Sequence, residues 1–254
     1  MNYLVIPCFN EAERLQESEV LKCVNGLDGV VVLVNDGSTD GTLALLQKIS
    51  AIHIERIKIL NLERNVGKGE AVRAGFIFAI AQGATEIGFC DADFSVDYRD
   101  LSRIFAKLNE NKSVYGVIGS RVEVAGSVIE RANLKYFTGR AFATLVRLVL
   151  KQKIYDTQCG AKAFRVTPIV EKVFSTPFHS RWAFDVEIIG RINKLTNGEN
   201  STVIELPLMR WIEQPGSKLT FLSRIRTVFE LIKIRKSLNK WRTRQESNLQ
   251  PFDP

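Results

Sequence analysis

Short apolar runs alternate with segments of helical periodicity through the first half of the chain. Apolar runs that end in polar or glycine-containing segments predict β-strands, and the periodic segments between them predict α-helices. This alternation favours an α/β fold, in which helices cover a mostly parallel sheet. The expected strands are Tyr3–Pro7, Val30–Asn35, Arg56–Asn61, Glu86–Cys90 and Val114–Ser120. The expected helices are Glu11–Asn25, Thr42–Ser50, Lys68–Gln82 and Asp97–Asn109.

The second half is less regular. An apolar stretch with interspersed basic residues, Ile129–Leu150, predicts a long helical segment. A strand at Ala161–Phe164, a helix at Phe184–Lys194 and a late strand at Thr202–Leu206 are expected after it. Leu219–Leu238 predicts a basic amphipathic helix. We therefore expect one domain over residues 1–217, an amphipathic helix over 218–240 and an unstructured tail over 241–254.

Composition agrees with one large α/β domain, because 254 residues with 45% hydrophobic content can bury a sizeable core. The formal net charge of +7 and the pI of about 9.3 favour an anionic partner, such as a phosphate group, a membrane surface or nucleic acid. The four cysteines form no CxxC pair, which favours a reducing compartment and no zinc site. No signal peptide precedes Tyr3, and no apolar run reaches the roughly 18 residues of a membrane span.

The strongest candidate for chemistry is the pair Asp91 and Asp93, directly after an apolar strand. Alternation along an extended chain would place both carboxylates on one side. Hard divalent cations such as Mg²⁺ or Mn²⁺ prefer oxygen ligands and often bridge to phosphates. The carboxyl end of a sheet strand is also where an α/β fold usually binds its ligand. A pair of aspartates one residue apart also occurs in ordinary loops, so the neighbouring motifs decide the interpretation.

The loops after the first three strands are rich in turn-forming and polar residues. Asp36 and the residues that follow it read as a well-made βα turn, or as a site where Asp36 accepts a hydrogen bond from a nucleobase. The loop at Asn65–Gly69 contains two glycines that allow close backbone approach, and Lys68 could meet a phosphate. Neither the P-loop pattern nor the dinucleotide-binding glycine fingerprint is present.

Five motifs follow one another along the chain, and a second set continues the series. The first set is Val5-Ile6-Pro7-Cys8-Phe9-Asn10-Glu11, Asn35-Asp36-Gly37-Ser38-Thr39-Asp40-Gly41-Thr42, Asn65-Val66-Gly67-Lys68-Gly69, Asp91-Ala92-Asp93 and Gly119-Ser120-Arg121. The second set is Asp156-Thr157-Gln158-Cys159-Gly160-Ala161-Lys162, Trp182-Ala183-Phe184-Asp185-Val186-Glu187 and Ser217-Lys218. The first set resembles the family 2 glycosyltransferases with a GT-A fold. The second narrows the resemblance to dolichyl-phosphate β-glucosyltransferases, with dolichyl-phosphate mannose synthases as close relatives.

The resemblance implies a role for each matched residue. It implies that Pro7, Phe9 and Glu11 hold the nucleoside, that Asp36 faces the base, and that Asp91 and Asp93 bind a metal ion and the diphosphate. It places Arg121, Arg131 and Lys218 as cations near the donor and acceptor phosphates, and Asp156 and Asp185 near the acceptor. One departure is Asn35, which stands where the family usually has an aspartate and removes a charge beside the base pocket. Another is the membrane helix with which eukaryotic relatives begin, which this sequence lacks.

The reaction that the resemblance implies is inverting transfer of a sugar, glucose from UDP-glucose, to a polyprenyl or dolichyl phosphate with Mg²⁺ or Mn²⁺. GDP-mannose as donor, or a different acceptor, remains open. For three residues a structural role competes with the catalytic one. Asp185 could be a helix-surface or capping residue, Asp156 a loop carboxylate paired with a nearby lysine or arginine, and Arg121 part of a surface ion pair. For Trp182, a position in the hydrophobic core is expected before a role as an aromatic surface on which a sugar stacks.

The Leu219–Leu238 helix has a second candidate role at a membrane. Basic residues surround its apolar positions, a pattern typical of a peripheral protein on anionic lipid, and the implied lipid substrate favours the cytoplasmic face of a membrane. The alternative is a helix packed on the sheet with a solvated basic face. A basic nucleic-acid-binding module competes as a class, but no RNP, KH or zinc pattern supports it. The sequence indicates no oligomeric state. The expected apolar positions are Leu219, Leu222, Ile225, Val228, Phe229, Ile232 and Leu238.

Overall fold

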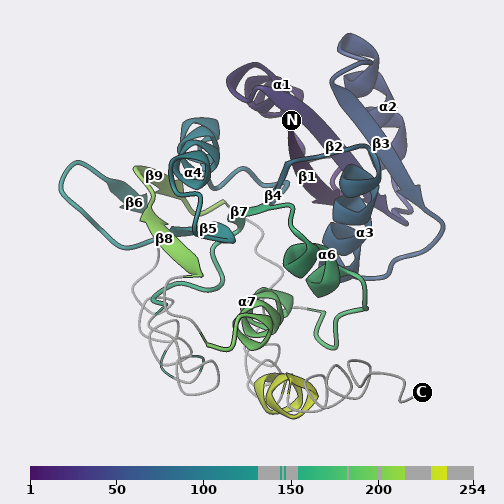
Figure 1. Ribbon diagram of the computed structural model, residues 1–254. Helices are drawn as coiled ribbons and strands as arrows, with labels where there is room; N and C mark the ends of the chain where they lie inside the picture. Colours follow the sequence, from purple (N-terminus) through teal and green to yellow (C-terminus); the bar gives the residue numbers. More distant parts are fainter. Residues whose placement is uncertain are drawn as a thin grey trace, which may run out of the picture.

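The central element is a seven-stranded sheet with strand order β3-β2-β1-β4-β7-β5-β8 (Figure 1). The computed structural model describes residues 1–130, 144, 146, 154–181, 183–198, 202–214 and 230–238. Its strands are β1 (Asn2–Cys8), β2 (Gly29–Asp36), β3 (Ile57–Leu62), β4 (Glu86–Cys90), β5 (Gly116–Ser120), β7 (Ala161–Arg165) and β8 (Val203–Pro207). The strands β1 to β4 pair in parallel, β7 runs antiparallel to both of its neighbours, and β5 pairs in parallel with β8. The expected mostly parallel sheet is confirmed.

Helices cover both faces of this sheet because alternate strand residues are apolar on both sides. In β1, Val5 faces one buried cluster while Leu4 and Ile6 face the other. The first cluster also takes residues from α3, α6, α7 and the helix at 230–238, and the second takes residues from α1, α2 and α4. The helices are α1 (Glu17–Gly26), α2 (Thr42–Ile52), α3 (Lys68–Ala81), α4 (Tyr98–Glu110), α6 (Pro168–Phe174) and α7 (Phe184–Leu195).

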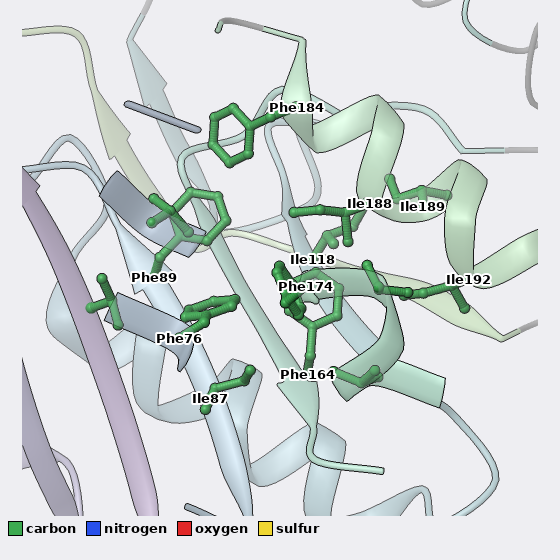
Figure 2. Close-up of a cluster of buried hydrophobic side chains, with 14 of the residues drawn as sticks. Phe76, Ile87, Phe89, Ile118, Phe164, Phe174, Phe184, Ile188, Ile189 and Ile192 are labelled. Atoms are coloured by element: carbon green, nitrogen blue, oxygen red, sulfur yellow. The ribbon is translucent and has the colours of Figure 1, made fainter. Parts of the chain in front are cut away.

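An aromatic cluster in the first core fixes the start of α7 against the end of β4 (Figure 2). The ring centroids of Phe89 and Phe184 lie 5.6 Å apart, and those of Phe76 and Phe174 lie 4.8 Å apart in an edge-on arrangement. Phe89 stands two residues before Asp91, and Phe184 directly precedes Asp185. Packing of these rings therefore brings two carboxylates that are far apart in sequence to the same end of the sheet.

Three parts of the fold differ from the sequence prediction. Ile129, expected to begin a long helical stretch, lies in β6 (Val128–Glu130), which pairs in parallel with β9 (Arg210–Ile212). This pairing involves residues about 80 positions away, so local periodicity did not indicate it. Of the rest of that stretch, only residues 144 and 146 are described, and both are helical.

Helix α1 begins at Glu17 and not at Glu11, because the Glu11 backbone amide donates to the Thr42 hydroxyl at 2.8 Å and ties that segment to a loop. Helix α6 was not predicted.

The described end of the basic C-terminal helix packs on the first core. Leu231, Ile234 and Leu238 are buried there, whereas Ile232 is 52% exposed. Of the expected apolar positions, Leu238 is buried in this core and Ile232 is exposed, while the buried stripe also includes Leu231 and Ile234. Contact of Ile232 with a membrane stays a prediction. Residues 219–229 and the tail at 241–254 lie outside the described residues. Within the described part, no helix has the length and apolar character of a membrane span.

Candidate functional site

Four βα loops meet at the carboxyl edge of the sheet because β3, β2, β1 and β4 are parallel neighbours there. The loop after β1 is joined to the loop after β2: the Asn10 amide donates to the Ser38 hydroxyl at 3.0 Å, and the Thr39 amide donates to the Asn10 side chain at 2.9 Å. Asn10 has φ of 52°, a left-handed conformation that asparagine adopts more readily than most residues. The two loops therefore form one connected rim beside the expected nucleoside position.

The residues expected to hold the nucleoside all lie on this rim. Pro7 lies in the last part of β1 and is half-buried, as is Phe9 just beyond it. Glu11 is buried, and its carboxylate accepts from the Arg14 guanidinium at 2.8 and 3.0 Å. The structure places these residues at one edge, and their contact with a nucleoside stays a prediction.

Asp36 holds the loop after β3. Its Oδ1 accepts from the Val66 amide at 2.7 Å, and its Oδ2 accepts from the Gly67 amide at 3.0 Å and from Asn65 Nδ2 at 2.9 Å. Burial raises the pKa of this carboxyl group, and the hydrogen bonds from the loop oppose that effect. Asp36 was predicted to face a nucleobase. Its two oxygens are engaged by the loop that carries Lys68, so it also sets the position of that lysine.

Asp91 and Asp93 lie on a turn directly after β4, in which the Phe94 amide donates to the Asp91 carbonyl at 3.2 Å. They were expected on an extended chain, and the turn replaces that arrangement. Lys68 Nζ lies 2.6 Å from Asp91 Oδ1. Burial would lower the pKa of Lys68, but the carboxylates of Asp91, Asp185 and Asp93 raise it above its ordinary value. Burial and the charge of Asp91 raise the pKa of Asp93.

A second buried ion pair lies beside this turn. Lys162 Nζ lies 2.7 Å from Asp185 Oδ1, and both side chains are almost fully buried. The same ammonium donates to the Cys159 carbonyl at 2.5 Å. Burial raises the pKa of Asp185, and Lys162 and Lys68 oppose that rise. Asp185 is therefore a buried partner of Lys162 and is also influenced by the charge of Lys68, where the sequence had left open a surface or capping position on α7.

Arg121 and Asp156 form a third pair at the end of β5. Arg121 Nε and Nη2 donate to the two Asp156 oxygens at 2.6 and 2.7 Å, and the Arg121 amide donates to Oδ2 at 3.0 Å. The guanidinium carbon lies 5.3 Å from the centre of the Trp211 ring. Burial would raise the pKa of Asp156, but Arg121 holds it below its ordinary value. The ion pair expected for Asp156 is confirmed, but for Arg121 the pair is largely buried and not on the surface, and it lies at the edge of the site.

Sequence reasoning missed Lys162, Trp211 and Arg181 as parts of this region. Lys162 carried a signal, since it is a lysine flanked by apolar residues inside a strand. Trp211 and Arg181 carried none, because their partners lie far away in sequence: Arg121 for the first and Asn65, at 2.6 Å, for the second. Arg131, Lys218 and Trp182 lie outside the described residues.

The donor set at the turn fits a hard divalent cation that shares its ligands with a substrate. Asp91 and Asp93 supply carboxylate oxygens, the ligand type that Mg²⁺ and Mn²⁺ prefer. Gly160 allows the backbone to close over Asp91, since a Cβ there would lie 2.5 Å from Asp91 Oδ2. Among the described residues, no group of three or more His, Cys, Asp or Glu side chains could enclose a metal ion. The remaining ligands would therefore come from water or a diphosphate.

Comparison with known proteins finds one family and a consistent set of relatives. The profile of "Glycosyl transferase family 2" matches residues 3–171. The dolichyl-phosphate β-glucosyltransferase of Drosophila melanogaster is 32% identical over 94% of this chain and 76% of the fly protein. That of Saccharomyces cerevisiae is also 32% identical, over 91% of this chain and 73% of the yeast protein.

A solved structure agrees on the fold. The glucosyl-3-phosphoglycerate synthase of Mycobacterium tuberculosis, determined with Mn²⁺, UDP and glucosyl-3-phosphoglycerate, superposes with a TM-score of 0.65 over 92% of this chain and 79% of its own. Its sequence identity of 15% limits that similarity to the fold.

Proposed function

The chain belongs to glycosyl transferase family 2, and we propose that it transfers glucose from UDP-glucose to a dolichyl or other polyprenyl phosphate. Relatives that carry this activity in their names align with more than nine-tenths of the chain. The motifs that first indicated the family also meet at one edge of the sheet, where a nucleotide sugar would bind. The identities of the donor, the acceptor and the metal ion are part of this proposal.

The choice of acceptor rests on the two carboxylates expected near it, Asp156 and Asp185, which are both engaged in ion pairs. Asp156 is held by Arg121, and Asp185 is held by Lys162. Arg121 lowers the proton affinity of Asp156, which makes that carboxylate a poor general base. The pKa of Asp185 is raised by burial, but its Oδ1 is already engaged by the Lys162 ammonium. A sugar hydroxyl acceptor would need a general base. A phosphate monoester is already an anion at neutral pH, so it needs positioning rather than deprotonation.

The chemistry then consists of one displacement. An oxygen of the acceptor phosphate attacks the anomeric carbon, the bond from that carbon to the nucleoside diphosphate breaks, and the configuration inverts to give a β-linked product. Asp91 and Asp93 would hold Mg²⁺ or Mn²⁺, which supplies charge neutralisation for the leaving diphosphate. Arg121, fixed by Asp156 and Trp211, provides an oriented cation at the site edge. Arg131 and Lys218 are proposed as further phosphate-binding cations.

A lipid acceptor requires the site to reach a membrane surface, and we propose peripheral attachment at the cytoplasmic face through the C-terminal basic helix. On its described part Lys233, Arg235 and Lys236 are exposed while the apolar stripe is buried. Attachment by this part would therefore be electrostatic, with on the order of 1 kcal/mol for each cation near an anionic surface. Among the described residues of this helix, only Ile232 could insert an apolar side chain, so a larger apolar face would have to come from other residues.

The experiment that tests the function is a donor panel assayed with purified protein, a polyprenyl phosphate and Mn²⁺. UDP-glucose is expected to give a glucosylated lipid, and removal of Asp93 by Asp93→Ala is expected to abolish turnover without loss of folding. Exclusive use of GDP-mannose would replace the proposed donor by the mannosyl alternative. Transfer to a hydroxyl acceptor but not to the lipid phosphate would refute the proposed acceptor.

A further inference from the structure

The position of Lys68 against Asp91 has consequences for metal binding. Lys68 is the first residue of α3, and its Nζ lies 2.6 Å from Asp91 Oδ1. The ammonium also lies 5.9 Å from the centres of the Phe89 and Phe184 rings, a distance at which a cation is attracted to an aromatic face. Two elements of the core therefore hold this cation next to the carboxylate.

The carboxylate of Asp91 is enclosed on two sides. The Gly160 backbone lies so close that a Cβ there would meet Oδ2 at 2.5 Å, and the Asp91 amide donates to the Gly160 carbonyl at 3.1 Å. Oδ1 has no solvent exposure, and the Lys68 ammonium lies against it. A metal ion that uses both oxygens would have to displace Lys68 from Oδ1.

The charges of the cluster also favour replacement of the Lys68 ammonium by a divalent metal ion at Asp91. Lys68 and Lys162 face the carboxylates of Asp91, Asp93 and Asp185, which leaves one net negative charge. A divalent cation would convert this to one net positive charge, beside an ammonium that it repels. A diphosphate brings negative oxygens that can accept both the metal ion and the ammonium.

We propose that Lys68 is a tethered competitor for the divalent cation at Asp91, so that the metal ion binds tightly only together with the donor diphosphate. The diphosphate oxygens would draw the ammonium away from the carboxylate and free its oxygen for the metal ion. This inference rests on the proposed metal-dependent function and adds an order of events to it. It makes nucleotide binding and metal binding mutually dependent through a residue of the chain itself.

The test is a Mn²⁺ titration of the nucleotide-free protein, followed through the electron paramagnetic resonance signal of free Mn²⁺. Lys68→Met is expected to bind Mn²⁺ at least about fivefold more tightly than the unsubstituted protein, the lower end of typical coupling between sites. Lys22→Met is the matched control, because Lys22 also has an ion pair of 2.6 Å, with Glu19, but on the exposed surface of α1. Its Mn²⁺ affinity is expected to be unchanged.

Addition of UDP provides a second measurement. UDP is expected to raise the Mn²⁺ affinity of the unsubstituted protein, and to raise that of Lys68→Met by a smaller factor. Equal or weaker Mn²⁺ binding by Lys68→Met in the absence of nucleotide would overturn the proposal, as would no effect of UDP on the unsubstituted protein. Circular dichroism checks folding, and Lys68→Gln takes the place of Lys68→Met if the latter does not fold.

One further variant separates this inference from the proposed function. Asp93→Asn is expected to weaken Mn²⁺ binding in the presence of UDP. If Mn²⁺ binding with UDP is insensitive to Asp93→Asn, the proposed metal site is wrong and the competition fails with it. If that binding is sensitive but Lys68→Met binds no more tightly, the metal site stands and only the role of Lys68 is refuted.

Discussion

Arg121 and Asp156 are joined by three hydrogen bonds, two from the guanidinium and one from the Arg121 backbone amide. The two residues are 35 positions apart, and the Asp156 side chain is only 11% exposed. The amides of Tyr155 and Asp156 in turn donate to the Glu205 carboxylate, each at 2.7 Å. The pair is thus fixed from β5, from the segment before β7 and from β8.

Asp156→Asn is expected to lower the free energy of unfolding by about 3 kcal/mol, because it leaves a largely buried guanidinium without its counterion. Urea denaturation monitored by circular dichroism measures this loss. The matched control is Glu17→Gln, which removes the partner of Lys48 in an exposed ion pair and is expected to cost less than about 1 kcal/mol. Similar costs for the two variants would show that the Arg121–Asp156 pair contributes no more than a surface pair.

Asp93→Asn is expected to stabilise the metal-free protein at neutral pH. The pKa of Asp93 is raised above its ordinary value of 3.8, so the folded state binds more protons than the unfolded state between those two values. Stability from this group therefore falls as pH rises through that window, and the penalty is complete above it. Urea denaturation at pH 7 and at pH 4 should show a larger gain at pH 7. A loss of stability at pH 7 would contradict the assigned cause.

For Asp156 the sign is opposite. Its pKa is lowered, so its contribution is complete above 3.8 and is lost as pH falls through the lowered value. The loss of stability caused by Asp156→Asn should therefore become smaller in acid. The gain of stability caused by Asp93→Asn should also become smaller in acid. The measurement for Asp156 extends the urea series below pH 3.8, because its contribution is still complete at pH 4, whereas pH 7 and pH 4 serve for Asp93.

UDP is expected to raise the thermal midpoint of the protein only when Mg²⁺ or Mn²⁺ is present. A ligand at about 100 times its Kd stabilises the folded state by roughly 2.7 kcal/mol, which a thermal shift assay detects readily. The measurement compares UDP with and without EDTA, and EDTA alone serves as the control. A shift of the same size in EDTA would argue against metal bridging at Asp91 and Asp93.

Arg131→Ala is expected to impair use of the lipid phosphate more than binding of the nucleotide. Loss of a charge-assisted contact to phosphate costs about 1.5–3 kcal/mol, or roughly ten- to a hundredfold in rate at low acceptor concentration. Steady-state kinetics with each substrate varied in turn separate the two effects. Arg99→Ala, which removes an exposed arginine near the start of α4, is the control. Equal losses for nucleotide and acceptor would place Arg131 at the donor instead.

The C-terminal helix allows stability and membrane attachment to be tested separately. Ile234→Ala is expected to cost about 2–5 kcal/mol in unfolding free energy, because Ile234 is fully buried in the first core. Replacement of the exposed Lys233, Arg235 and Lys236 by serine is expected to leave stability unchanged but to reduce flotation with anionic vesicles.

Salt should reduce the same binding, since the Debye length falls to about 3 Å at 1 M. Undiminished flotation of the triple variant would move the proposed anchor to residues outside the described part of this helix. Loss of stability in the triple variant would show that these cations also support the fold.

The helices and strands of the first half, and the edge at which the site would form, could be predicted from the amino-acid sequence alone. Strands β1 to β4 and helices α2, α3 and α4 were expected within about two residues of their observed bounds. This succeeded because apolar periodicity and turn residues are local signals, and because the carboxyl ends of parallel strands share one edge. The motif residues Pro7, Glu11, Asp36, Lys68, Asp91 and Asp93 all reach that edge.

The pairing of the charges at that edge could not be predicted, because it depends on long-range contacts. Lys162 meets Asp185, Arg121 meets Asp156, and Asp36 is taken up by the loop that carries Lys68. The same holds for the pairing of β6 with β9 and for the packing of Ile234, not Ile232, on the core. These outcomes depend on the packing of segments far apart in the chain. A carboxylate or an isoleucine carries no local signal of the partner that burial will bring to it.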